Sequence, residues 1–154
     1  MIKEMNCDML EAPIDIGSQC VNCHCRMASG LALSIKKQYP EVYQDDLQTE
    51  PGDRSKLGTV RIVKLENPRG QLAYVANCYA QFNFGTEKRQ VNYEAIYKCF
   101  EILKVYIEQN GLVLGIPFRM GCGLAGGDWR IVRSMIDVVF GDLEKDVLIC
   151  KIED

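Results

Sequence analysis

The sequence lacks the features that mark several large classes of protein. No apolar run approaches the ~20 residues that span a bilayer, and residues 1–8 hold no apolar core of a signal peptide. Lysine and arginine together number 18 against 21 aspartates and glutamates, so the net charge of −3 creates no basic field for nucleic acid. We therefore expect a cytoplasmic protein without nucleic-acid or membrane partners.

Histidine is almost absent, whereas cysteine is not. His24 is the only histidine, and hence the only side chain that by default titrates near neutrality. The eight cysteines are expected to be reduced thiols, because nothing directs the chain to an oxidising compartment. Cys20-x-x-Cys23-His24-Cys25 resembles half of a metal site, but no second ligand pair of matching spacing follows. We predict no metal and no other cofactor.

The hydrophobic pattern predicts one domain over residues 1–154, because 154 residues suffice for one core. Alternating or continuous apolar runs indicate strands, and helical spacing indicates helices, the longest capped by Asn92 and ended by Gly111. Strands are expected at 2–5, 16–23, 59–65, 71–79, 111–117 and 146–152, and helices at 31–39, 93–110 and 129–140. This order, with one hairpin at 67–70, predicts an α/β fold whose mixed sheet carries helices on both faces.

A glycine-rich segment follows the strand expected at 111–117. Gly121, Gly123, Gly126 and Gly127 lie between that strand and a helix that begins near Trp129. Glycine lets a backbone approach an anion closely, and amides at a helix start point toward it. No Lys-Ser or Lys-Thr follows the glycines, so the segment is not a Walker loop.

The segment Cys20 to Ala32 has the same order of strand, small residues and helix. Such sheets bind ligands beyond the carboxyl ends of their strands. Two segments of this kind in one domain predict a ligand with more than one phosphate, or with a phosphate and a sugar.

The residues of these two segments carry a resemblance to a family. Cys25-Arg26-Met27-x-x-Gly30-x-Ala32 and Gly121-Cys122-Gly123-Leu124-x-x-x-x-Trp129 together resemble macro domains. The resemblance is to the branch of terminal ADP-ribose protein glycohydrolases and ADP-ribose 1″-phosphate phosphatases, which has phage and bacterial members. It extends from Cys7 to the last strand, and implies a three-layer α/β/α sandwich that binds ADP-ribose or a derivative, with an ADP-ribosylated protein as a further partner.

The resemblance also implies site residues. Asp8 matches the acidic residue that accepts the adenine amino group, although a turn-capping role is the alternative. Asn22 matches an asparagine near the distal ribose, and a strand-end turn is equally consistent with it. Adenine would contact Met9 and Ile152, although Ile152 could equally belong to the core. The distal ribose and phosphates would contact Cys23, Met27, Ala28, Ser29 and Gly30. The diphosphate would lie against Gly121, Cys122, Gly123, Leu124 and Ala125, and the ligand would also contact Arg119 and Met120.

The sequence departs from the glycohydrolase pattern at two places. That branch uses a lysine that attacks the anomeric carbon and an aspartate in the second loop, and the matching positions here hold Cys78 and Ala125. A covalent mechanism through lysine is therefore disfavoured. Cys122 as a phosphatase nucleophile is rejected, because the Cys-x5-Arg pattern would need arginine where Asp128 stands.

Two catalytic hypotheses remain, each with a plainer alternative. His24 is a candidate acid or base or an exposed loop histidine, and Asp128 is a candidate base for water or the N-cap of the last helix. Phe84 either closes over the distal ribose or belongs to the core. The sequence thus predicts an ADP-ribose-binding hydrolase acting on ADP-ribose 1″-phosphate or an ADP-ribosyl ester; the alternative is a binding module without turnover.

Overall fold

The computed structural model describes residues 1–85, 88–123 and 125–152. Its centre is a six-stranded sheet of order β1-β6-β5-β2-β4-β3. All neighbouring strands are parallel except β3 and β4, which form an antiparallel hairpin. The strands are β1 (Ile2–Asn6), β2 (Ile16–Val21), β3 (Val60–Lys64), β4 (Tyr74–Tyr79), β5 (Leu114–Pro117) and β6 (Val147–Lys151).

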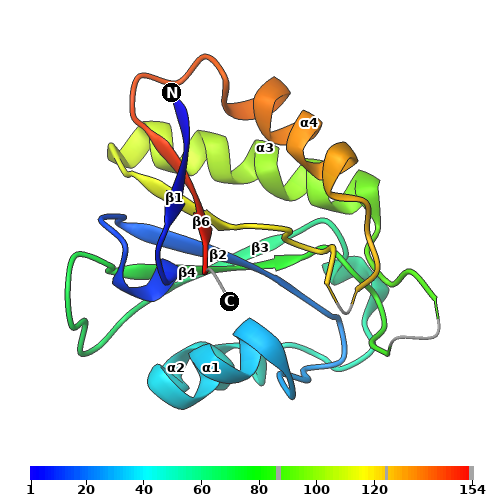
Figure 1. Ribbon diagram of the computed structural model, residues 1–154. Helices are drawn as coiled ribbons and strands as arrows, with labels where there is room; N and C mark the ends of the chain where they lie inside the picture. The colour runs from blue at the N-terminus through cyan, green and yellow to red at the C-terminus, as the bar shows by residue number, and fades with distance from the viewer. Residues whose placement is uncertain (86–87, 124, 153–154) are drawn as a thin grey trace.

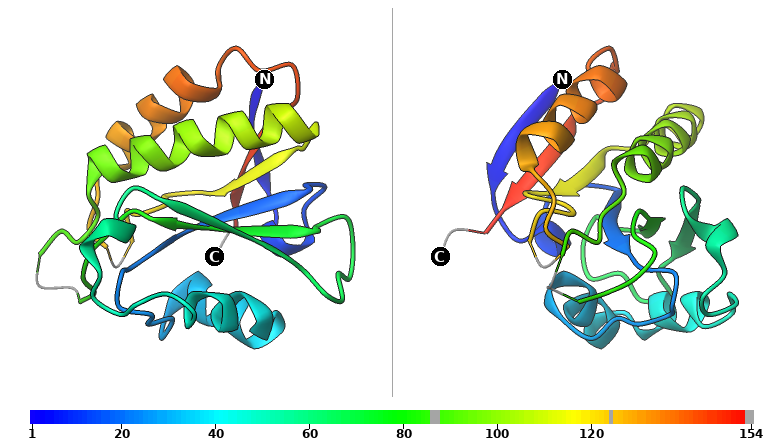
Figure 2. Two further views of the ribbon diagram at one scale, coloured as in Figure 1. Left: turned by 180° about the vertical axis from the view of Figure 1, so that it is seen from behind. Right: turned by 90° about the vertical axis from the view of Figure 1, so that its right-hand side faces the viewer.

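Helices cover both faces of this sheet (Figure 1). The helices α1 (Gly30–Gln38) and α2 (Pro40–Asp46) lie on one face, and α3 (Tyr93–Asn110) and α4 (Trp129–Phe140) lie on the other, as both views in Figure 2 show. Two short 3-10 turns, Met9–Glu11 and Arg54–Lys56, complete the elements. The predicted three-layer α/β/α sandwich with a mixed sheet is confirmed.

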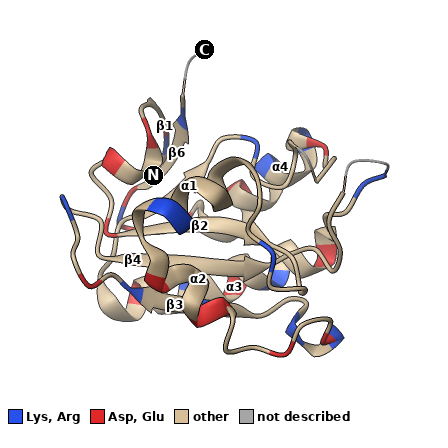
Figure 3. Ribbon diagram, turned by 90° about the horizontal axis from the view of Figure 1, so that it is seen from below, with Lys and Arg blue, Asp and Glu red and all other residues tan. Residues whose placement is uncertain are grey.

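Each face of the sheet has its own apolar core. Beneath α3 and α4, one cluster gathers side chains such as Ile96, Phe100 and Leu103, which follow one another at helical spacing. The other cluster lies beneath α1 and α2 and includes Ile35 and Val42. The interior strands β2 and β4 carry no charged residue, whereas loops and helices around them do (Figure 3). Strands buried on both faces cannot keep charges hydrated, which explains why these two strands are uncharged.

The ends of α3 and α4 follow the sequence signals. The side chain of Asn92 accepts a hydrogen bond from the amide of Ala95 at 3.0 Å, and Gly111 ends α3 with a φ of 64°. Asp128 caps α4 by accepting from the amide of Arg130 at 2.9 Å. Asp128 thus fills the plainer of its two predicted roles.

The helix α2 was not expected from the sequence. Pro40 does lie beyond the end of α1, but it also begins α2, because proline suits the first helical position. In the part of the chain that the structure describes, no helix combines the length and apolar character needed to cross a bilayer.

Candidate functional site

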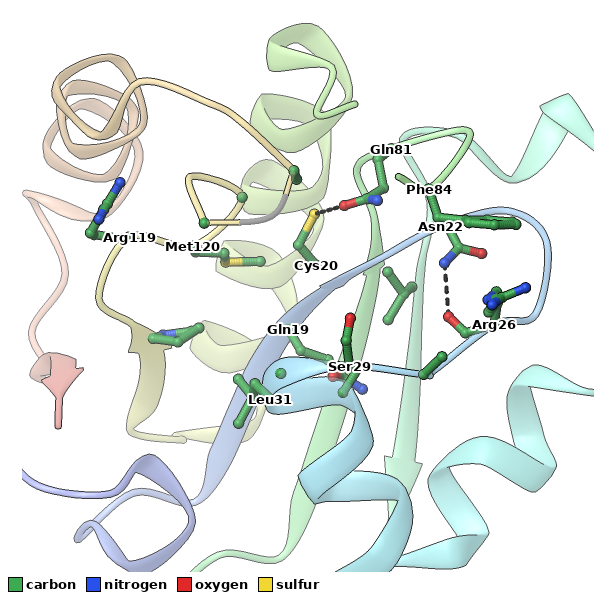
Figure 4. A pocket seen from close by; sticks show the side chains of 18 of the residues that line it. Gln19, Cys20, Asn22, Arg26, Ser29, Leu31, Gln81, Phe84, Arg119 and Met120 are labelled. Atoms are coloured by element: carbon green, nitrogen blue, oxygen red, sulfur yellow. Dashed lines mark hydrogen bonds between the residues drawn. The ribbon is translucent and has the colours of Figure 1, made fainter. Parts of the chain in front are cut away.

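A cavity opens where the parallel strands β2, β4 and β5 end (Figure 4). Its volume of about 620 Å³ falls within the range of small-molecule sites. It lies beyond the carboxyl ends of the strands, where open α/β sheets bind ligands. Three segments line it: the loop after β2 with the start of α1, the loop after β4, and the loop after β5. The two segments singled out by the sequence are therefore brought together around one cavity.

The loop after β2 is fixed by Asn22, which lines the cavity. The amide nitrogen of its side chain donates to the carbonyl of Arg26 at 2.8 Å, and its side-chain oxygen accepts from the amide of His24 at 2.9 Å. Asn22 thus acts as a strand-end turn residue, one of the two roles foreseen, while it still faces the cavity. Cys25 completes the turn with a φ of 57°, a conformation uncommon outside glycine.

The start of α1 forms one corner of the cavity. Ala28, Ser29 and Gly30 line it, and Ser29 occupies the N-cap without a hydrogen bond from its side chain to the helix. The first amides of a helix have no partner within it, and the helix dipole makes this end partly positive. This corner of the cavity therefore suits an anion.

The loop after β5 folds back on itself through backbone hydrogen bonds. The amide of Cys122 donates to Arg119 and that of Gly127 to Gly121, at 2.7 and 2.9 Å. A Cβ on Gly127 would lie 2.7 Å from the Gly121 oxygen, so only glycine fits there. Of the predicted residues, Arg119, Met120, Gly121, Gly123 and Ala125 line the cavity. Leu124 lies outside the described residues.

Several predicted ligand residues lie elsewhere. Cys23 and Met27 point into the core beneath α1 and α2, because the turn at Asn22 directs their side chains inward. Cys122 is likewise buried, and desolvation raises the pKa of its thiol to about 11, which leaves it little nucleophilic character near neutrality.

The residues predicted for adenine also lie outside the cavity lining. Asp8 caps a short turn by accepting from the amide of Leu10 at 2.9 Å, which is its alternative role. Met9 is buried in the core, and Ile152 is 65% exposed.

Neither candidate catalytic side chain lines the cavity. The ring of His24 lies edge-on to Phe82 and Phe84, with centroids 4.8 and 5.9 Å away, and its Nε2 is buried without a hydrogen-bond partner among the described residues. The carboxylate of Asp128 is paired with the Arg130 guanidinium, and hydrogen bonds from Arg130 hold the pKa of Asp128 below its usual value. A carboxylate stabilised in its charged form is a poor general base.

The positions that match the lysine and aspartate of the glycohydrolase branch hold no acid or base. Cys78 is fully buried on the α3 side of the sheet, where a hydrogen bond with Cys99 and burial raise the pKa of its thiol. Ala125 lines the cavity, and its carbonyl accepts from the amides of Gln90 and Val91 at 2.8 and 3.3 Å.

Sequence reasoning missed other residues of the lining. Cys20 donates to the side chain of Gln81 at 3.4 Å, and burial raises the pKa of its thiol. Phe118 packs edge-on against Trp129 at 5.2 Å. The strand expected at 16–23 gave a partial signal, because Cys20 is the second-last residue of β2, at its carboxyl end. Gln19 and Arg26 also line the cavity, and Arg26 belongs to one of the two motifs.

The charges of the lining have one sign. Among the described lining residues, Arg26 and Arg119 carry the only formal charges, and no aspartate, glutamate, histidine or lysine accompanies them. Figure 4 shows the two arginines on opposite sides of the cavity. Among the described residues, no group of three or more His, Cys, Asp or Glu side chains is placed to hold a metal ion. The lining can therefore bind an anion through amides and guanidinium groups.

Comparisons with known proteins agree with this architecture. No family model matches the chain. A 17.5 kDa protein from the tk-vs intergenic region of Enterobacteria phage T4 is 33% identical over 126 residues, covering 80% of this chain and 78% of the relative. The human ADP-ribose glycohydrolase OARD1 is 30% identical over 138 residues, covering 86% of this chain and 80% of the enzyme.

Solved structures share the fold at lower identity. The macrodomain of Thermus aquaticus DarG superposes with a TM-score of 0.79 at 22% identity, covering 100% of this chain and 99% of that one. Thermosipho africanus DarTG in complex with ADP-ribose gives 0.77 at 22% identity, covering 94% of this chain and 39% of that one. With its sandwich, its two loops and these relatives, the chain belongs to the macro domain family.

Proposed function

We propose that the cavity binds ADP-ribose. The observation that carries this proposal is a lining of backbone loops and two arginines, with no carboxylate among its described residues. Backbone amides in such a lining suit a diphosphate, because they donate to its oxygens without competing negative charge. The two arginines add positive charge to the cavity. The glycohydrolase activity named for OARD1 and the ADP-ribose bound to DarTG support the same ligand.

In this proposal the diphosphate lies between the start of α1 and residues 121–125. The distal ribose lies near Asn22, beside the loop after β4. The adenine extends to the opposite side of the cavity, toward the surface that carries Asp8 and Ile152, beneath which Met9 is buried. In this position the phosphates lie against the start of α1 and residues 121–125, and the distal ribose lies beside the loop after β4.

We further propose that the protein is a hydrolase at the distal ribose. Water would attack the phosphate of ADP-ribose 1″-phosphate, or the carbonyl of an ADP-ribosyl ester, and the sugar would leave with a hydroxyl at its anomeric carbon. An ADP-ribosylated protein is then a further partner, whereas nucleic acid is not, and the expected compartment is the cytoplasm. The glycohydrolase route through lysine is disfavoured, because Cys78 lies in the core and Ala125 has no acidic group.

A binding module without turnover is the second candidate. It is favoured by the described lining, which offers no histidine, carboxylate or lysine to move a proton. Binding and hydrolysis would use the same cavity, so only turnover separates them.

The first test is calorimetric titration with ADP-ribose, with AMP as the control ligand. Micromolar binding of ADP-ribose that AMP does not reproduce is expected, and absence of binding would refute the proposed ligand. Multiple-turnover release of phosphate from ADP-ribose 1″-phosphate, or of ADP-ribose from an ester, would then exclude the binding module. If neither phosphate nor ADP-ribose is released at any enzyme concentration, the hydrolase is excluded.

The same assay tests His24 and Asp128. Because neither side chain lines the cavity, we expect His24→Ala and Asp128→Ala to keep turnover close to that of the wild type. A loss of about 100-fold or more in either variant, with the melting temperature preserved, would assign that residue a role in proton transfer.

A further inference from the structure

A stack of three aromatic rings with a cation at each end stands beside the cavity. The Arg26 guanidinium lies over the ring of Phe84 at 4.5 Å, Phe84 meets His24, His24 meets Phe82, and the Arg54 guanidinium lies over Phe82 at 3.8 Å. The stack joins the loop after β2, the turn Arg54–Lys56 and the loop after β4. Of its two cations, Arg26 lines the cavity and Arg54 does not.

Arg26 is held in position from two sides. Its carbonyl accepts from the side chain of Asn22 at 2.8 Å, which fixes its backbone, and its guanidinium rests on Phe84, which limits its side chain. Figure 4 shows Asn22, Arg26 and Phe84 together on one side of the cavity. A side chain ordered before the ligand arrives loses less entropy on binding. Arg26 is thus prepared for a contact at this side.

Among the described residues, nothing occupies the side-chain donors of Arg26. Its guanidinium makes no hydrogen bond or ion pair with any residue that the structure describes, although it has five N–H groups. Arg119, the other charged lining residue, already donates to the Cys122 carbonyl at 3.0 Å. A free, oriented guanidinium matches two oxygens of a phosphate or carboxylate.

We propose that Arg26 is a specificity-determining residue that binds a phosphate carried by the distal ribose. The inference rests on the proposed function, which places the distal ribose beside Asn22. It selects between the two substrate classes named above, because a phosphate monoester carries negative charge at this point, whereas an ester linkage is neutral. The substrate class favoured by the cavity is therefore the sugar 1″-phosphate, with Arg26 on its phosphoryl oxygens.

The experiment compares two arginines of the same stack. Arg26→Gln and Arg54→Gln each remove one exposed charge and one cation–π contact, but only the first changes the cavity. The ligands are ADP-ribose and the analogue of its 1″-phosphate in which a methylene group replaces the bridging oxygen, so that no turnover disturbs the titration. Calorimetry gives a dissociation constant for each pair.

We expect Arg26→Gln to weaken binding of the phosphonate by about tenfold or more, the loss typical of a charge-assisted hydrogen bond. Its affinity for ADP-ribose should stay within about threefold, and Arg54→Gln should keep both affinities within about threefold, as for an exposed charge without a partner. Arg26→Lys, which keeps the charge but not the fork, should recover part of the loss.

Equal weakening of both ligands by Arg26→Gln, or no weakening of the phosphonate, would overturn the assignment. Loss of both affinities in Arg54→Gln as well would show that the stack only maintains the fold of the loops. If the wild type binds ADP-ribose but not the phosphonate, this inference fails while the proposed function stands. If it binds neither, the proposed function fails first, and the inference with it.

Discussion

Replacing Gly121 with alanine tests whether the fold of the loop after β5 requires glycine at this position. Gly121 has a φ of +74°, which costs a residue with a Cβ about 1–2 kcal/mol. The new Cβ would lie 2.9 Å from Cγ2 and 3.6 Å from Cβ of Val91, so Val91 must leave its rotamer at a further cost of about 0.5–1.5 kcal/mol. The expected loss of unfolding free energy is therefore about 2–3 kcal/mol.

For a chain of this length each kcal/mol lowers the melting temperature by about 2–4 °C, so Gly121→Ala should melt roughly 5–10 °C lower. Gly123→Ala is the matched control, because Gly123 lines the same cavity but has open space around its Cβ position and no positive φ. It should melt within about 2 °C of the wild type. Calorimetric melting of both variants decides the matter. If Gly121→Ala melts as the control does, glycine at this position is not required by the fold.

Three further predictions concern other parts of the molecule. Asn92→Ala should lose about 1 kcal/mol of stability in thermal denaturation, because the amide of Ala95 loses its acceptor, whereas Asn92→Asp should not. Because the pKa of Cys122 is about 11, only about one thiol in 4,000 is ionised at about pH 7.4. Iodoacetamide should therefore modify Cys122 slowly by peptide mass analysis, and rapid alkylation in the native protein would contradict its burial. Burial raises the pKa of Asp46, so the folded protein favours its protonated carboxyl. The stability that this preference contributes is present below the unfolded-state pKa and is lost as pH rises through the folded-state pKa. Urea denaturation should thus show Asp46→Asn gaining on the wild type as pH rises above the unfolded-state pKa of about 4. The opposite trend would mean that the hydroxyl of Tyr79, which donates to Asp46 at 2.6 Å, outweighs burial.

The strands and the two long helices could be predicted because their residues repeat at regular spacing. The helix that begins at Pro40 could not, since proline both ends one helix and begins the next. Lys56 shows a second limit. It lies between the helix expected at 31–39 and the strand expected at 59–65, yet it is buried, and its ammonium group donates to the hydroxyl of Thr49 at 2.9 Å. Two partners distant in the sequence, Cys25 and the ring of Tyr79, also contact that ammonium group, and spacing along the sequence does not reveal them.

The site was predictable where it depends on the backbone. Gly121 and Gly127 are required by their conformation or by the space around them, so their pattern in the sequence points directly to the loop. Side-chain roles were less accessible. His24 attracted a catalytic hypothesis because it is the only histidine, but its ring packs between two phenylalanines. Arg26 lies two residues further along and faces the cavity, a difference set by the turn at Asn22.

The distance between the diphosphate and the bond to be cleaved has a consequence for catalysis in the cavity. The backbone at the start of α1 and in the loop after β5 lies where the diphosphate is proposed to bind, whereas the bond to be cleaved lies at the distal ribose. Affinity gained at the diphosphate accelerates hydrolysis only if it holds the distal end in a reactive geometry. The described residues at that end include Asn22, Arg26 and Phe84, none of which exchanges a proton near neutral pH. Hydrolysis by these groups must therefore depend on orienting water and on stabilising charge as it develops on the leaving oxygens, which a guanidinium can do and a carboxylate cannot.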